Sequence, residues 1–194
     1  MRFKVQKRRR QENKTDYELR MGLLKSGVLR IVIRKTNRYV YAQIVESKEA
    51  QDFVMQKVSS KDLIKEGWDK KFSGSLKSIP ACYLTGLLLA KKVGKGKFII
   101  DTGMARNVHG SRIFAFVNGL IDGGLEINAD KKAFPNEKRV IGEHLKPEIK
   151  TSINKLKDKL KKWKLQINFQ IFGTRGVPSE NETWNSKKRR NCWK

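Results

Sequence analysis

The sequence is poor in the residues from which disulfide frameworks and metal sites are built. Its 194 residues include only two cysteines, Cys82 and Cys192, and two histidines, His109 and His144. Two thiols cannot make a framework of several disulfides or a four-thiolate zinc site. The spacing of the four residues together fits no zinc finger. We therefore expect no disulfide-stapled fold and no bound metal, and no motif in the chain indicates a cofactor.

Long apolar runs are also missing. The longest, residues 84–90, is interrupted by Gly86 and is far shorter than the roughly 20 apolar residues that a membrane span needs. The first 20 residues are basic, like the start of a signal peptide, but no apolar run follows them. The sequence therefore predicts an intracellular, cytoplasmic protein without a membrane segment.

Acidic residues are outnumbered by basic ones. There are 44 Lys and Arg against 19 Asp and Glu, a formal net charge of +25. The excess is densest at the ends: residues 1–25 hold nine basic and three acidic side chains, and residues 150–194 hold thirteen and three. Such an excess has to be neutralised by a polyanion, and nucleic acid is the abundant one inside cells. An anionic membrane surface is the lesser alternative.

Three parts are predicted from these differences: a basic N-terminal arm over residues 1–25, an α/β domain over 26–148, and a basic C-terminal extension over 149–194. The extension should contain an amphipathic helix from Pro147 to Trp163, followed by alternating residues typical of a strand at 165–171.

The middle part has the periodicities of an α/β protein. Three strands joined as an antiparallel meander are predicted over 29–34, 38–46 and 52–58. Two apolar helices should follow, with a short buried strand between them, over 78–93, 97–101 and 111–122. A strand, a crossover helix and another strand in this order imply a parallel pair, and therefore a mixed sheet.

Local signals refine these elements. Ser59 and Asp62 have the spacing of a capping box before a short helix that Gly67 ends. Thr15 and Ser111 are candidate N-caps of two further helices. Along the first strand, Arg30 and Arg34 alternate with apolar residues, which predicts one wet or RNA-facing side.

Three basic segments are candidate nucleic-acid contacts. The arm offers arginine forks that match phosphate oxygens. The hairpin tip carries basic residues beside Tyr39 and Tyr41, which could stack on bases, although tyrosines on strands are more often packing pairs. The junction at 109–112 opens a helix, whose N-terminal N–H groups favour phosphate. The candidate residues of the three segments are Lys7, Arg8, Arg9, Arg10, Lys14, Arg20, Arg34, Lys35, Asn37, Arg38, His109, Gly110, Ser111 and Arg112.

A catalytic interpretation has little support. Asp101, Asp122, Glu126 and Asp130 could be imagined as a two-metal nuclease, but they fall on separate predicted elements. No nucleophile elbow or phosphate-binding loop is present. A divergent metal-dependent nuclease of the ribonuclease-H type stays as the alternative to a non-enzymatic RNA-binding protein.

Seven ordered blocks resemble the large-subunit ribosomal protein eighteen family, which binds 5S ribosomal RNA. They are RRRQENKTDYELR, LRIVIRKTNRYVYAQIV, LIKEGW, ACYLTGLLLAKK, IDTG, HGSRIFAFVNGLIDGGLEI and FPNEKRVIGEH. The resemblance covers residues 1 to about 148 and is closest to the archaeal and eukaryotic branch, with an archaeal length. Cys82 stands where alanine is commoner, and residues 150–194 match no pattern of the family.

The resemblance implies a ribonuclease-H-like α/β fold with a mixed sheet, packed helices and no nuclease activity. It implies a structural protein of the 50S subunit, in the central protuberance, whose partners are 5S rRNA, 23S rRNA, large-subunit protein five and other proteins of that region. It also places on RNA every candidate residue given above except Lys7 and Arg20, which rest on the charge of the arm alone.

Overall fold

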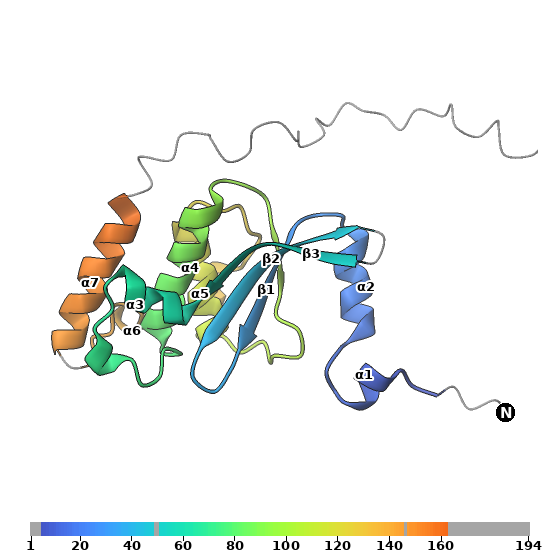
Figure 1. Cartoon of the computed structure of the whole chain (residues 1–194), viewed down its shortest axis with the longest axis horizontal. Helices are drawn as coiled ribbons and strands as arrows, with labels where there is room; N and C mark the ends of the chain where they lie inside the picture. The colour runs from blue at the N-terminus through green and yellow to red at the C-terminus, as the bar shows by residue number, and fades with distance from the viewer. Residues whose placement is uncertain (1–4, 49–50, 146, 163–194) are drawn as a thin grey trace, which may run out of the picture.

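A computed structural model describes residues 5–48, 51–145 and 147–162 of the chain (Figure 1). The predicted strand at 165–171, Trp163 and Cys192 lie outside these residues. Among the helices described, none combines the length and the apolar character needed to cross a bilayer.

Four strands form one mixed sheet in the order β3-β2-β1-β4. Their bounds are β1 Arg30–Lys35, β2 Val40–Lys48, β3 Gln51–Ser59 and β4 Ile99–Asp101. The first three form an antiparallel meander, whereas β4 pairs with β1 in parallel and places Asp101 opposite Val32. Each strand overlaps the range predicted for it, with bounds shifted by at most two residues, and the predicted α/β class with a mixed sheet is confirmed.

Two long helices form the centre of the core. They are α4, Ile79–Val93, and α5, Arg112–Asp122. They approach so closely that a Cβ on Gly86 would collide with the carbonyl oxygen of Phe116, and a Cβ on Gly119 with that of Tyr83. Tyr83 meets Gly119 near one end of the contact and Ala90 meets Gly123 near the other, so the helices run parallel. Side chains of α4 also pack across β2 and β3.

Shorter elements complete the body. They are η1 Ser60–Asp62, α3 Leu63–Glu66, η2 Lys70–Phe72, η3 Lys131–Ala133 and α6 Glu137–Ile141. The predicted capping box is confirmed, because the Ser59 hydroxyl accepts from the Lys61 N–H while Asp62 accepts from the Ser59 N–H. The predicted helix at the start of the C-terminal extension is α7, Pro147–Lys162, drawn in orange at one end of the molecule in Figure 1.

At the opposite end in Figure 1 lie two N-terminal helices, α1 Arg8–Gln11 and α2 Tyr17–Lys25. Neither helix contributes a buried residue. The predicted cap at Thr15 is wrong by one residue: the Asp16 carboxylate accepts from the N–H groups of Glu18 and Leu19, and a carboxylate at this end also suits the helix dipole.

The predicted wet side of β1 is wrong for Arg30. Only 2% of this residue is exposed, because Asp52 of β3 and Asp101 of β4 enclose its guanidinium group. Alternation assigns alternate residues to opposite faces of a strand correctly, but it does not say which neighbours cover the polar face.

Candidate nucleic-acid interface

One edge of the sheet gathers several chain segments that lie far apart in sequence. Because β1 and β4 are parallel, the hairpin that follows β1 and the loop that follows β4 leave the sheet at the same edge. The hairpin tip contacts the loop before α4, where the Arg38 Nε donates to the carbonyl oxygen of Gly74 over 3.4 Å. Since α4 and α5 run parallel, both helices present their N-terminal ends here.

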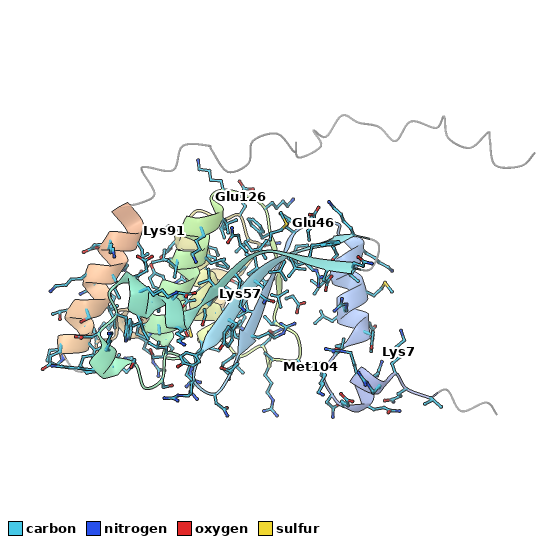
Figure 2. The ribbon with its side chains drawn as sticks, viewed as in Figure 1. Lys7, Glu46, Lys57, Lys91, Met104 and Glu126 are labelled. Carbon is cyan, nitrogen blue, oxygen red and sulfur yellow. The ribbon has the colours of Figure 1, made fainter. Side chains whose placement is uncertain are left out.

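We call this surface the basic edge. It contains exposed or half-exposed residues of the hairpin tip, of the loop after β4 and of the start of α5. Its members are Lys35, Asn37, Arg38, Arg106, His109, Gly110, Ser111 and Arg112. Met104 projects from the loop at this edge, whereas Glu126 lies at the opposite edge of the molecule (Figure 2).

The hairpin tip is a firm support for its exposed side chains. The N–H and hydroxyl of Thr36 both donate to the carbonyl oxygen of Tyr39, over 2.8 and 2.9 Å, and close the turn. Tyr39 packs edge-on against Tyr41, with the ring centroids 6.5 Å apart. Tyr39 also packs against the apolar core, so the packing interpretation of these tyrosines is favoured over base stacking. Lys35, Asn37 and Arg38 remain exposed around the turn.

The start of α5 is the second part of the basic edge. Ser111 occupies the predicted N-cap position, but its hydroxyl forms no hydrogen bond to the helix and is buried without a partner among the described residues. Gly110 has a φ of +67°, a left-handed conformation that suits glycine, and its N–H donates to the carbonyl oxygen of Ala133. Arg112 is exposed in the first turn. The backbone here is therefore fixed, and a positive side chain stands beside the helix N-terminus.

The charges of Arg112 and Lys35 act on the same buried group. Burial raises the pKa of the Cys82 thiol to about 12, and the positive charges of Arg112 and Lys35 oppose this rise. A side chain of α5 and one of the hairpin thus lie near the first turn of α4. The hairpin and the start of α5 therefore both contribute positive potential near the N-terminal turn of α4.

The arm presents the largest exposed group of basic residues. The Lys7 ammonium lies 4.5 Å from the centre of the Tyr17 ring, and the Arg9 Nε donates to the Thr15 hydroxyl over 2.9 Å. Arg8 and Lys14 both approach Glu12, at 3.7 and 2.7 Å. Exposed ion pairs of this kind contribute little, so phosphate can replace the carboxylate.

Two other predicted contacts form ion pairs with carboxylates of the sheet, although the side chains of Arg20 and Arg34 remain 40% and 48% exposed. Arg20 binds Asp52 over 2.8 Å, and the Arg34 guanidinium donates to a side-chain oxygen of Asp101 over 3.0 Å and to its carbonyl oxygen over 2.9 Å. Both arginines belong to a network of five charged residues that crosses the sheet. This Arg–Asp network consists of Arg20, Asp52, Arg30, Asp101 and Arg34.

Asp52 links two arginines of the network, Arg20 and Arg30. Its Oδ1 accepts from Arg30 over 2.7 Å and from the Ser47 hydroxyl over 2.6 Å, and its Oδ2 accepts from Arg20. Burial works against ionisation of Asp52, but the Ser47 hydrogen bond and the charges of Arg30 and Arg20 together lower its pKa below the usual value. Asp52 is therefore ionised at neutral pH.

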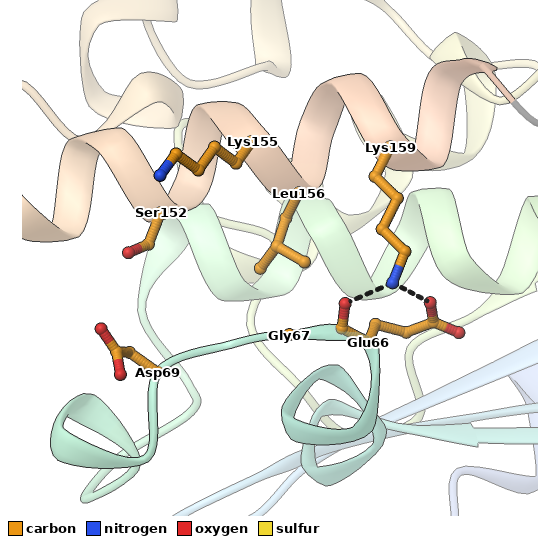
Figure 3. A pocket seen from close by; sticks show the side chains of 7 residues that line it. All are labelled: Glu66, Gly67, Asp69, Ser152, Lys155, Leu156 and Lys159. Atoms are coloured by element: carbon orange, nitrogen blue, oxygen red, sulfur yellow. Dashed lines mark hydrogen bonds and ion pairs between the residues drawn. The ribbon is translucent and has the colours of Figure 1, made fainter.

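Of the four α7 lysines whose side chains the structure describes, three contact groups of the body. Lys150 approaches Glu143 at 3.8 Å, and the Lys157 ammonium lies 5.6 Å from the centre of the Tyr83 ring. Lys159 donates to the carbonyl oxygen of Glu66 over 2.7 Å and lies 3.4 Å from its carboxylate (Figure 3). The contact between Lys159 and Glu66 borders a groove of about 370 Å³ between α7 and the segment after α3.

The carboxylates considered for a nuclease do not form a metal site. Asp101 is held by Arg30 and Arg34, and Asp122 accepts from the Tyr83 hydroxyl over 2.6 Å. Within the described residues, no group of three or more Cys, His, Asp or Glu side chains is arranged to hold an ion. The geometry gives no support to two-metal catalysis.

Arg106 was missed as a candidate from the sequence, because it lies in a loop with no periodic pattern and no neighbouring basic residue. The parallel pairing of β1 and β4 is the signal that could have found it, since it brings this loop beside the hairpin tip.

Comparison with known proteins identifies related chains. The family model described as "Ribosomal large subunit proteins 60S L5, and 50S L18" matches residues 1–97. The chain is 42% identical over 147 residues to large ribosomal subunit protein uL18 of Korarchaeum cryptofilum, covering 74% of the chain and 73% of the relative. It is 38% identical over 184 residues to uL18 of Caldivirga maquilingensis, covering 93% and 84%. The uL18 protein of Methanoculleus marisnigri is 42% identical over 147 residues, covering 74% and 82%.

Proposed function

The chain belongs to the uL18 family of large ribosomal subunit proteins, and from this premise we propose that it binds 5S rRNA through the basic edge and the N-terminal arm. It is a structural constituent of the large subunit rather than an enzyme, and it works in the cytoplasm within the ribosome. Association with rRNA and with other ribosomal proteins follows from membership of the family.

The convergence of three segments at the basic edge supports the choice of a structured RNA. The hairpin tip, the loop after β4 and the start of α5 each have a fixed backbone and exposed basic or amide groups. Fixed groups of this kind can distinguish one RNA shape from another, whereas phosphate contacts from the arginines of the arm can form with any RNA. The edge therefore supplies discrimination for 5S rRNA, and the arm supplies affinity.

The remaining partners are part of the same proposal. In it, the arm spans residues 1–25, the 5S-binding domain 26–148 and the basic extension 149–194. The protein helps to attach 5S rRNA to 23S rRNA in the central protuberance, beside large-subunit protein five. The high positive charge of both terminal parts suits contacts with two RNA molecules at once.

Filter binding tests this proposal with 5S rRNA from a related archaeon and an unrelated structured RNA of equal length. We expect at least tenfold tighter binding to 5S rRNA at physiological salt, since about 1–3 kcal/mol of discrimination is typical of one good base contact. Equal affinity for both RNAs would leave only charge attraction and contradict the assignment of 5S rRNA.

A further inference from the structure

We propose that the Arg–Asp network is a positioning device that fixes the N-terminal arm relative to the basic edge, and that Asp52 is the residue that joins the arm to the network. The inference rests on the proposed function, because it concerns how two RNA-binding parts are held together. It gives Arg20 and Arg34 a role different from the phosphate contact predicted for them.

The network joins the two surfaces physically. At one end, Arg20 comes from α2, which leads directly to the arginines of the arm. At the other end, Arg34 begins the turn of the hairpin, and the Asp101 Oδ1 also accepts from the N–H of Gly103 in the loop after β4 over 2.8 Å. The residues between them lie on β3, β1 and β4, and Arg30 reaches across β2 to Asp52, so the connection crosses the sheet.

Burial makes the centre of the network rigid. Arg30 is 2% exposed, and its guanidinium group donates to Asp52, to the Ser47 hydroxyl and, over 3.4 Å, to Asp101. A buried charge that loses its partners is costly, so Arg30 holds both carboxylates in place. Asp52 uses one oxygen for this internal contact and the other for Arg20. It therefore holds α2 at a defined position on the sheet.

The arm needs such a contact because its helices have little other attachment. No residue of α1 or α2 is fully buried: Leu19 and Met21 are 44% and 55% exposed, and Leu23 and Leu24 are half-buried. Two binding surfaces held at a fixed spacing bind one RNA more tightly than two loosely joined ones, because the second contact forms at a high effective concentration. Holding the arm in place therefore raises affinity without adding a contact.

The substitution Asp52→Asn distinguishes positioning of the arm from a change in electrostatic attraction to RNA. The variant keeps one oxygen for the buried Arg30 and loses the carboxylate that holds Arg20, while every basic residue remains. Removal of a negative charge alone should strengthen RNA binding. We expect instead that affinity for 5S rRNA falls about tenfold at every salt concentration, with the slope of log affinity against log salt unchanged. Faster tryptic cleavage at Arg20 and Lys25 should accompany the loss.

Matched variants of the full chain control this result. Glu126→Gln removes the same charge at the opposite edge and should bind as the unmodified protein or slightly more tightly. Asp52→Glu restores a carboxylate and should recover most of the affinity. In a background with Arg8, Arg9 and Arg10 replaced by alanine, Asp52→Asn should have no further effect, because it acts through the arm.

Arg20→Gln breaks the same contact from the side of α2 and decides the matter if Asp52→Asn fails to fold. The same tenfold loss with an unchanged slope supports the positioning role. A slope reduced by about 0.7–0.9 would mean that Arg20 binds a phosphate, and it would overturn the proposal. Unchanged or tighter binding by Asp52→Asn would also overturn it. Absence of any 5S preference in the unmodified protein would instead contradict the proposed function.

Discussion

The two basic terminal segments are attached to the body in opposite ways. The C-terminal helix α7 buries Ile153, Leu156 and Leu160, which are 1%, 3% and 4% exposed, in the common core. The N-terminal helices bury no side chain, and α2 reaches the sheet through the ion pair between Arg20 and Asp52. The segments lie at opposite ends of the molecule in Figure 1.

Their basic residues differ in the same way. In α7, Lys150, Lys157 and Lys159 are directed to groups of the body, whereas the basic residues of α1 contact only groups of the arm itself. Equal density of positive charge therefore does not mean equal availability to RNA. Helix α7 is part of the folded body, whereas the basic residues of the arm are available to bind a polyanion.

The largest expected effect is on the packing of α7. Leu156→Asp should lower the free energy of unfolding by at least about 3 kcal/mol, because it removes a buried leucine and introduces a carboxylate into the core. Leu19→Asp makes the same change on the exposed α2 and should cost about 0.5 kcal/mol or less. Urea denaturation of both variants measures the difference.

The folded body should survive Leu156→Asp, since the contact between α4 and α5 does not involve α7. Limited proteolysis should then release α7 while the sheet remains protected. Equal destabilisation by both substitutions would contradict the distinction between the two segments.

Most of the fold was predictable from the sequence, because apolar periodicity reports which faces are buried. The alternation of β1 and the core stripe of α5 identify their elements directly. The close contact of Gly86 with α5 was not predictable, since it depends on two helices meeting at glycines far apart in sequence. The N-cap was predicted at Thr15 but lies at Asp16, because both residue types are good caps and the local sequence does not distinguish between them.

The candidate site was predictable only as a set of basic residues. Sequence identifies the hairpin tip and the residues around Ser111, but it does not show that Arg34 faces Asp101 or that Arg30 is buried. Those facts depend on pairing between strands that are about 70 residues apart, as the separation of 71 between Arg30 and Asp101 shows. Which basic residues are exposed on the surface can therefore be predicted only when such strand pairings are known.

The arm and the basic edge should differ in their effect on RNA binding. Replacing Arg8, Arg9 and Arg10 together by alanine should reduce the salt slope by roughly 2 to 3, if each contacts one phosphate, and weaken 5S and unrelated RNA by similar factors. Asn37→Ala or Arg112→Ala should cost about 1–3 kcal/mol for 5S rRNA and change the slope by about one or less.

Affinities measured at four salt concentrations, for both RNAs, give the salt slope and the preference for 5S rRNA separately. The arm arginines lie on the short helix α1, which buries no residue, and contacts to phosphate carry little information about RNA sequence, whereas Asn37 and Arg112 stand at the hairpin turn and at the start of α5. If the triple substitution abolished the preference for 5S rRNA and left the slope intact, the arm would be reading RNA shape, and this division of roles would be wrong.

The smallest expected effect is a difference in stability between substitutions of two lysines one turn apart on α7. Lys159→Ala removes the hydrogen bond to the Glu66 carbonyl and an ion pair with its carboxylate, both at a half-exposed position. Because solvent weakens such contacts, the loss should be about 0.5–1 kcal/mol of stability. Lys155 lines the same groove but is exposed (Figure 3), and Lys155→Ala should change stability by less than about 0.5 kcal/mol.

Neither variant should alter the salt slope for 5S rRNA, because α7 is attached to the body rather than to RNA. A slope reduced by about one in Lys155→Ala would make α7 a second phosphate-binding surface, and the two terminal segments would then be alike in function although they differ in packing.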